Sequence, residues 1–304
     1  MEIFRQKVRG RKQTGVEIRT MQKGKGQAMA QKKKVTATVF RQDEIADGIY
    51  DMWIETELAQ DARPGQFIGV YPKNAATLLP RPISICEVNE ERTMLRIVYR
   101  VAGKGTEEFS TIHTGDRIGI LGVLGNGFPL EKAAGKRVFL MGGGIGIPPM
   151  LQLAKQLAAA AEQEHTLAGG KSMMSGPAQI DVILGYRNEL FLYDDFQAYA
   201  NVYVATEDGS AGSKGTVMHA IEDNGLKGDV IFACGPMPML RAIKKFAEDN
   251  NMEAYISLEE RMACGVGACL GCVCKTKEED AHSHVHNARI CTDGPVFDAK
   301  EVMI

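Results

Sequence analysis

The densest group of chemically reactive side chains in this 304-residue sequence is a set of cysteines near its C-terminus. The run C-G-V-G-A-C-L-G-C, followed later by one more cysteine, has the C-x4-C-x2-C…C spacing of a plant-type [2Fe-2S] site. Glycines within the run let backbone amides turn toward the sulfur atoms, which larger side chains would obstruct. The expected cluster ligands are Cys264, Cys269, Cys272 and Cys291.

Other interpretations of these cysteines remain open. A structural zinc site is one, although zinc sites favour paired C-x2-C units. Cys274 could replace Cys272 as a ligand, although its C-x-C spacing is tight. Three histidines between the last two expected ligands are predicted to belong to a solvated loop rather than to a metal site: His282, His284 and His286.

A glycine-rich run at residues 137–150 predicts a buried strand that leads through a loop into a helix beginning at a proline. Such glycines let a nucleotide approach the backbone, and the helix N-terminus offers free N–H groups to a pyrophosphate. A tight turn is the alternative. Pro149 replaces the third glycine of G-x-G-x-x-G, which disfavours an ordinary Rossmann dehydrogenase. The glycines expected to face the nucleotide are Gly142, Gly143, Gly144 and Gly146.

Two further motifs could hold a second nucleotide: R-P-I-S at 81–84 and G-K-G-T at 103–106. An arginine can bind a pyrophosphate through two hydrogen bonds. Pro82 fixes the local backbone, and Ser84 offers a hydroxyl to the edge of a ring. Each motif alone is also ordinary beside a β-turn.

The elements that must position these motifs change character along the chain. Residues 35–132 contain short strands separated by turns and predict a small antiparallel β-barrel, with strands at 49–55, 66–71, 81–87 and 94–101. Residues 133–252 predict a parallel α/β domain, with strands at 137–141, 180–185, 201–206 and 229–234 and helices from about 148 and over 238–249. Residues 253–304, with a strand at 253–258, predict a third, metal-organised unit. A surface loop is expected at 162–178.

The composition of the chain limits the class of protein and its expected location. The chain is 44% hydrophobic and 24% charged, as in globular proteins, with neither a membrane span nor a secretory signal, so we expect a cytoplasmic protein. Residues 1–34 carry eleven Lys or Arg residues against Glu2 and Glu17 and are expected to be disordered. Met29 could be the true start. A solvated tail is favoured over a nucleic-acid-binding arm, because Phe4 is the only aromatic residue there.

Taken in order, R-P-I-S, G-K-G-T, G-G-G-I-G-I-P-P and the C-G-P-M that begins at Cys234 resemble the ferredoxin reductase superfamily. The cysteine motif narrows the match. Together with 121–128, 206–215 and 294–297, it makes residues 35–304 resemble the electron-transfer subunits of NAD-linked dihydroorotate dehydrogenases. The resemblance implies an antiparallel β-barrel FAD domain, a parallel α/β nucleotide-binding domain and a small C-terminal [2Fe-2S] domain.

The resemblance also implies roles for individual residues. NAD would lie on the glycine loop, with Cys234 and Gly235 next to the nicotinamide, although a buried core thiol is the alternative for Cys234. FAD would be held by Arg81, Pro82, Ile83 and Ser84, by Val98, Tyr99 and Arg100, and by Gly105 and Thr106.

The implied partner is an FMN-containing catalytic subunit that oxidises dihydroorotate to orotate in pyrimidine (UMP) biosynthesis, in a heterotetramer with two copies of each subunit. Electrons would pass from it through the cluster and FAD to NAD⁺. A flavin is required because it exchanges single electrons with a cluster and a hydride with NAD⁺. No nucleic acid and no membrane is expected as a partner.

Two alternative functions remain. Reductase subunits of ferredoxin:NADP⁺ transhydrogenases and sulfide dehydrogenases share these motifs but often carry Asp where this chain has Cys264. An iron–sulfur or zinc regulator would leave the nucleotide motifs without purpose. Arg187 stands as a lone cation near the expected adenosine ribose, with Glu189, Asp194 and Asp195 following, so the sequence predicts NAD(H) rather than NADP(H).

Overall fold

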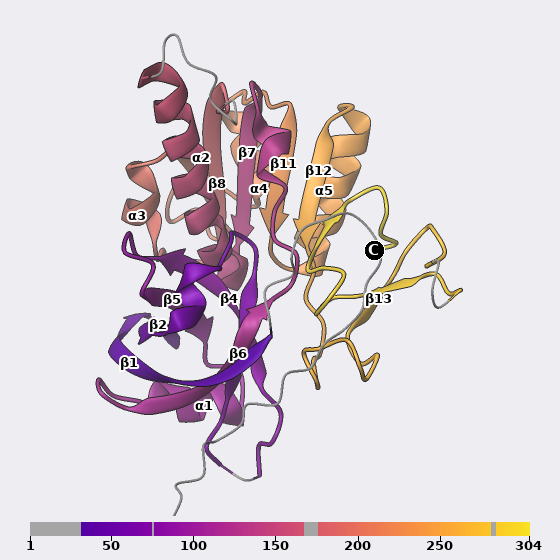
Figure 1. Ribbon diagram of the computed structural model, residues 1–304. Helices are drawn as coiled ribbons and strands as arrows, with labels where there is room; N and C mark the ends of the chain where they lie inside the picture. The colour runs from indigo at the N-terminus through magenta and orange to yellow at the C-terminus, as the bar shows by residue number, and fades with distance from the viewer. Residues whose placement is uncertain (1–31, 75, 167–175, 281–283) are drawn as a thin grey trace, which may run out of the picture.

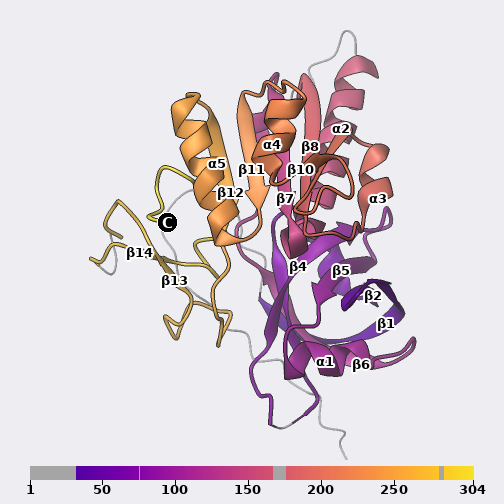
Figure 2. The same ribbon diagram turned by 180° about the vertical axis from the view of Figure 1, so that it is seen from behind.

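The computed structural model describes residues 32–74, 76–166, 176–280 and 284–304. A β-barrel, a seven-stranded sheet with helices on both faces and a small loop-rich region follow one another (Figures 1 and 2). The predicted fold class, a barrel joined to a parallel α/β domain and a small C-terminal unit, is confirmed. Within the described residues, no helix combines the length and apolar character needed to span a membrane.

Six antiparallel strands close the barrel in the order β1-β2-β5-β4-β3-β6. Alternating apolar positions fill its interior, where Met52, Ile54 and Ile97 have no exposed surface. All four predicted barrel strands are present. The strands and the helices that connect them are β1 (Lys33–Ala46), β2 (Ile49–Glu55), η1 (Glu57–Gln60), β3 (Phe67–Tyr71), β4 (Arg81–Val88), β5 (Met94–Arg100), α1 (Lys104–Ser110) and β6 (Arg117–Leu124).

The second sheet has the strand order β10-β9-β8-β7-β11-β12-β15, and all its neighbours are parallel except β12 and β15. Its strands are β7 (Arg137–Gly143), β8 (Gln179–Tyr186), β9 (Asn201–Thr206), β10 (Ser213–Lys214), β11 (Val230–Cys234), β12 (Glu253–Ser257) and β15 (Val296–Asp298). Its helices are η2 (Leu130–Ala133), η3 (Gly144–Gly146), α2 (Pro148–Thr166), α3 (Tyr193–Gln197), α4 (Val217–Asp223) and α5 (Met237–Asp249).

The central strands of this sheet are apolar on both faces because helices cover both. Every residue of β11 is buried. Helices α2 and α3 pack on one face, and α4 and α5 pack on the other (Figures 1 and 2). The carboxyl ends of the parallel strands therefore form one edge, where ligands of open α/β sheets bind.

The loop-rich region between β12 and β15 contains only two short strands in its described part, β13 (Val273–Lys275) and β14 (Asn287–Arg289). It packs against both larger units. A Cβ atom on Gly265 would lie 3.3 Å from side-chain carbons of both Leu121 and Leu124 of β6. Ile290 and Cys291 are buried in the hydrophobic core shared with the seven-stranded sheet. This region is thus placed beside the junction of the two larger units.

A buried ionic network fixes the barrel against the α/β domain. Arg96 of β5 donates to Asp51 within the barrel at 2.9 Å and to Asp195 of α3 at 2.6 Å. Glu87 of β4 accepts from Arg96 at 3.1 Å and from Lys155 of α2 at 3.0 Å. Because the charges neutralise one another and lie largely out of water, the network sets the relative position of the two units.

The structure differs from the sequence expectations in several places. Strand β1 begins at Lys33, inside the expected extension, while residues 1–31 lie outside the described part. The loop expected at 162–178 is wrong for 162–166, which continue α2, and 167–175 are not described. Strands β12 and β15 belong to the seven-stranded sheet, although the expected third unit began at residue 253. The pairing of β12 with β11 and of β15 with β12 places these strands in the sheet, and local sequence does not reveal such pairing.

Candidate functional site

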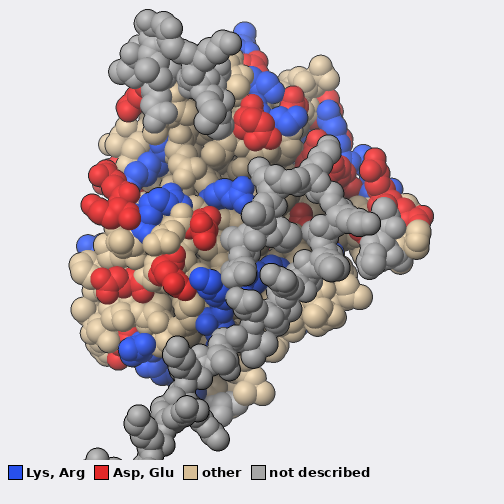
Figure 3. Space-filling view, viewed as in Figure 1, with Lys and Arg blue, Asp and Glu red and all other residues tan. Residues whose placement is uncertain are grey.

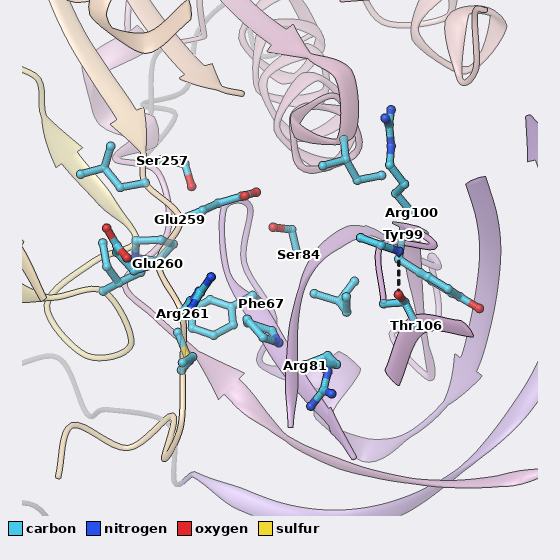
Figure 4. Close-up of a pocket in the computed structure, with 18 of the residues that line it drawn as sticks. Phe67, Arg81, Ser84, Tyr99, Arg100, Thr106, Ser257, Glu259, Glu260 and Arg261 are labelled. Atoms are coloured by element: carbon cyan, nitrogen blue, oxygen red, sulfur yellow. Dashed lines mark hydrogen bonds between the residues drawn. The ribbon is translucent and has the colours of Figure 1, made fainter. Parts of the chain in front are cut away.

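A cavity of about 570 Å³ lies where the barrel, the glycine loop after β7 and the segment after β12 meet (Figure 4). The residues predicted to hold FAD line this cavity, with the exception of Gly105. The rest of the wall comes from Phe67, Ala102, Ile145, residues 257–262, Ile290 and Pro295. The wall therefore draws on the barrel, the nucleotide loop and the cysteine-rich region together.

The R-P-I-S motif forms the barrel side of the cavity. Pairing of β4 with β3 holds Arg81 opposite Val70 and Ser84 opposite Phe67, while β5 pairs with the later part of β4, from Ile85 onward. A Cβ atom on Gly105 would lie 2.5 Å from Nε of Arg81, so only glycine lets the guanidinium lie against the start of α1. The Arg81 guanidinium donates to the Leu79 carbonyl, and no carboxylate among the described residues forms an ion pair with it. Its charge is available to an anion.

Two other predicted flavin residues have their hydroxyl groups engaged within the protein. The hydroxyl of Thr106 accepts from the amide of Ala102 at 2.9 Å and donates to the carbonyl of Gly103 at 3.0 Å. The Tyr99 hydroxyl donates to Oε1 of Gln42 at 2.9 Å, and burial raises the pKa of Tyr99. Thr106 thus shapes its loop, and the Tyr99 side chain is held in the barrel core, where its ring packs on Tyr50 and Phe109.

The glycine loop joins β7 to α2 at the carboxyl edge of the sheet. A Cβ atom on Gly146 would lie 2.4 Å from the carbonyl oxygen of Cys234, so the loops after β7 and β11 approach closely only because of this glycine. Gly144 has a φ of +52°, a conformation that favours glycine. Gly142 and Gly143 end β7, and Gly143 lies against Met239 of α5. The four glycines predicted to face a nucleotide are therefore together.

Cys234 ends β11 and is buried, with Gly235 directly after it. Its partner across the sheet is Ser257 of β12, which lines the cavity. Burial, with a smaller contribution from Glu259, raises the pKa of Cys234 to about 12 against an opposing effect of Ser257. The Cys234 thiol is therefore neutral. It does not line the cavity itself, but its neighbour Ser257 does.

The charged segment Glu259, Glu260 and Arg261 was not recognised from the sequence. In Figure 4 these residues line the side of the cavity formed by the segment after β12, and Glu259 extends toward Ser84. The Glu259 side chain is exposed toward the cavity, yet the protein around it partly desolvates the carboxyl and raises its pKa. A usable signal existed: charged residues directly after a buried strand at the carboxyl edge of a parallel sheet.

The four predicted cluster ligands form two pairs. Cys264 lies beside Cys269, and Cys272 lies beside Cys291. Backbone amides point at the sulfurs: Val266 donates to Cys264 at 3.4 Å, and Gly271 donates to Cys269 at 3.4 Å. The first pair is more accessible and the second is buried.

This arrangement suits a two-iron cluster. Each iron of such a cluster takes two thiolates, which two separate pairs supply, and amide donors stabilise the negative charge on sulfur. Among the described residues, no three or more His, Cys, Asp or Glu side chains converge as ligands of a single ion. The pairs therefore fit a [2Fe-2S] group better than the zinc alternative.

The remaining candidates lie apart from the pairs. Cys274 is in β13, opposite Ala288 of β14, and burial raises its pKa to about 11. His284 is exposed and contacts Glu279 at 3.1 Å, and His286 contacts the carbonyl of Lys277. His282 lies outside the described residues.

The barrel, the parallel sheet with its glycine loop and the paired cysteines define an oxidoreductase subunit of the ferredoxin reductase type. The family model "Oxidoreductase NAD-binding domain" matches residues 140–245, and "Iron-sulfur cluster binding domain of dihydroorotate dehydrogenase B" matches residues 259–303. A solved structure described as an NADH-dependent reduced ferredoxin-NADP oxidoreductase has 27% identity and a TM-score of 0.73, covering 88% of this chain and 89% of that one.

Two curated relatives are named "Dihydroorotate dehydrogenase B (NAD(+)), electron transfer subunit". The protein from Bacillus caldolyticus is 42% identical, covering 88% of this chain and 97% of its own length. The protein from Bacillus velezensis is 41% identical, covering 90% of this chain and 100% of its own length. The chain belongs to the family of dihydroorotate dehydrogenase B electron transfer subunits, which confirms the resemblance found in its motifs.

Proposed function

We propose that this chain carries electrons from a dihydroorotate-oxidising, FMN-containing catalytic subunit through a [2Fe-2S] cluster and FAD to NAD⁺, in pyrimidine biosynthesis. One observation supports this path above all. Ile290, which adjoins the predicted ligand Cys291, lines the same cavity as the R-P-I-S motif and Ile145 of the glycine loop. The three predicted cofactor regions therefore meet at one place.

The cavity residues fit a flavin dinucleotide. FAD, when bound, exchanges single electrons with a cluster and a hydride with NAD⁺. Arg81 would bind its pyrophosphate, because the guanidinium has no carboxylate partner among the described residues, and Ser84 would donate to or accept from the ring edge. The backbone of 98–100 and the loop closed by Thr106 would complete the wall.

The nucleotide loop would receive NAD on the other side of the same cavity. Gly144 would leave room for a pyrophosphate before the N-terminus of α2, because a Cβ atom there would meet no protein atom closer than 4.0 Å, whereas Gly142, Gly143 and Gly146 pack against Ile147, Met239 and Cys234. The neutral thiol of Cys234 and the backbone of Gly235 would border the nicotinamide. Because the thiol stays protonated, it excludes water and positions the ring instead of acting as a nucleophile.

The cysteine pairs would order the electron path. Cys264 and Cys269, the more accessible pair, would hold the iron that faces the partner. Cys272 and Cys291, the buried pair, would hold the iron nearer the flavin cavity. Dihydroorotate oxidation would take place in the FMN-containing catalytic subunit, in a heterotetramer with two copies of each chain.

The surface of the described part gives no sign of a polyanionic partner on the face shown. In Figure 3, Lys and Arg side chains are interspersed with Asp and Glu over the barrel and the α/β domain. Such mixed charge does not produce the basic field that nucleic-acid binding needs. A protein partner suits this face better.

The structural likeness to the NADH-dependent ferredoxin-NADP oxidoreductase supports one second candidate, a reductase subunit of a transhydrogenase-type enzyme. Cys264 at the first cluster position and the higher identity to the curated relatives favour the first proposal.

The test is co-expression of this chain with the neighbouring FMN-containing subunit and assay of the purified complex. We expect dihydroorotate-dependent reduction of NAD⁺, which Cys269→Ser abolishes, while NADH oxidation with an artificial acceptor continues in the variant. Ferredoxin reduction by a complex that shows no dihydroorotate-dependent reduction of NAD⁺ would favour the second candidate.

A further inference from the structure

Lys32 stands out by the burial of its charge. Its Nζ is the one buried side-chain nitrogen or oxygen without a hydrogen-bond partner in the described part of the chain. An ammonium group out of water is unfavourable unless a negative charge lies nearby. No described residue forms an ion pair with this ammonium group, so a negatively charged group bound at the site would compensate its charge.

Strand pairing places Lys32 beside the cysteine-rich region. Strand β1 pairs with β6, with Lys33 opposite Gly122 and Lys34 opposite Leu121. Gly265, next to Cys264, rests on that same stretch of β6, since a Cβ atom added to it would lie 3.3 Å from Leu121. Lys32 precedes this pairing by one residue and so enters the space between β6 and the cluster loop.

The charged groups around Lys32 also indicate that a negative group would bind beside it. Burial lowers the pKa of Lys32, and the nearby sulfur atoms of Cys291 and then Cys264 oppose that shift. Arg289 is also nearby, but Asp293 already pairs with it at 2.9 Å. Lys32 is therefore the cation in this neighbourhood that lacks a carboxylate.

We propose that Lys32 is the built-in counter-charge of the iron–sulfur cluster and raises its reduction potential. The inference rests on the proposed function only in requiring that the cluster be present. Reduction adds one electron, converts one ferric iron to ferrous and increases the negative charge of the cluster by one unit, with no proton taken up. A fixed positive charge beside the thiolates stabilises the reduced form more than the oxidised form.

The test is the midpoint potential of the cluster in the isolated, cofactor-loaded chain, followed by EPR during titration with dithionite. We expect Lys32→Gln to lower the reduced-to-oxidised ratio at a fixed potential at least about threefold, or roughly 28 mV for a one-electron couple. The matched control is Lys33→Gln. It removes the same charge one position away, on the opposite side of β1, where Lys33 pairs with Glu57 at 3.5 Å and both side chains are half exposed. Its shift should be less than a third as large.

Lys32→Arg keeps the charge and should keep the wild-type potential. If Lys32→Gln does not retain the cluster, the iron content of two further variants is measured. Retention of iron in Lys32→Arg but not in Lys32→Met supports the proposal. Loss of iron in all three variants overturns it, because the effect is then steric. Equal shifts in Lys32→Gln and Lys33→Gln also overturn it. A wild-type chain that holds no cluster would instead contradict the proposed function.

Discussion

The flavin cavity and the cluster loops are built in different ways. The cavity wall rests on barrel strands paired on both sides, above a core in which Met52, Ile54 and Ile97 are fully buried. The cluster region has only β13 and β14 as described strands of its own. Backbone amides donate to the sulfurs of Cys264 and Cys269, while Cys272 and Cys291 are buried in the core shared with the sheet.

This difference indicates how each region depends on its cofactor. A cavity carried by paired strands keeps its shape without a ligand, because the packing that holds it is elsewhere in the barrel. Loops that converge on sulfur atoms gain most of their cohesion when iron joins those atoms. FAD should therefore bind a preformed site, whereas the cluster should complete the structure around itself.

The largest expected effect follows loss of a ligand from the buried cysteine pair. Cys291→Ser should abolish iron, sulfide and the cluster EPR signal, because serine is a poor ligand for these irons and Cys272 loses its partner. FAD content should remain. The matched control is Cys274→Ser, which lies in β13 and should keep the cluster. Loss of the cluster in Cys274→Ser together with its retention in Cys272→Ser would contradict the proposed ligand set.

Removal of iron should loosen the cluster region selectively. After chelation under reducing conditions, amide hydrogen exchange over 264–275 and 287–291 should accelerate at least about a hundredfold, because the loops lose their shared anchor. Exchange in β2, β5 and β11 should remain unchanged. Equal acceleration in the barrel strands would show that the two regions do not differ as described.

Arg81→Ala should weaken FAD binding without loosening the barrel. Loss of a charge-assisted contact to the pyrophosphate costs about 1.5–3 kcal/mol, or roughly one to two decades in affinity. Fluorescence titration of the flavin-free protein measures it. Arg117→Ala, which removes an exposed charge from β6, is the control and should bind FAD normally. An unchanged affinity in Arg81→Ala would place the pyrophosphate elsewhere.

The smallest effect concerns nucleotide choice. Of the acids noted in the sequence, Asp195 pairs with Arg96, and Glu189 accepts from the amide of Asp47 at 3.1 Å. Glu207, at the end of β9, is the acid beside Arg187, 4.0 Å away, and both are largely exposed. It would repel a 2′-phosphate.

We therefore expect NADH to exceed NADPH at least about tenfold in kcat/KM, or roughly 1.4 kcal/mol. Glu207→Gln should narrow this preference, and the exposed Asp194→Asn should leave it unchanged. Diaphorase assays with both nucleotides measure the ratio. Equal efficiency of the two nucleotides in the wild-type chain would contradict the prediction.

Much of the fold was predictable because its signals are local. Alternation of apolar residues marks the barrel strands, and the apolar run before the glycine loop marks β7, so strand β2 was predicted with the bounds it has in the structure. The cysteine spacing likewise needs no tertiary information. The family then follows from motif order.

The features that escaped prediction depend on pairing between distant segments. Lys32 looked like part of a basic tail, and only the pairing of β1 with β6 brings it to the cluster loop. Glu259 reaches the cavity because β12 joins the sheet beside β11. Thr106 is of a residue type that contacts ligands, yet its hydroxyl closes its own loop.

The most direct test of the path is an anaerobic titration of the isolated, cofactor-loaded chain with NADH, followed by flavin absorbance and by the EPR signal of the cluster. Because Ile290 joins the cavity wall to the predicted ligand Cys291, electrons entering at the nucleotide side should reach the irons without any partner subunit. We expect bleaching of the flavin together with appearance of the reduced-cluster signal. Bleaching of the flavin while the cluster stays oxidised, in a sample whose cluster dithionite reduces, would contradict it.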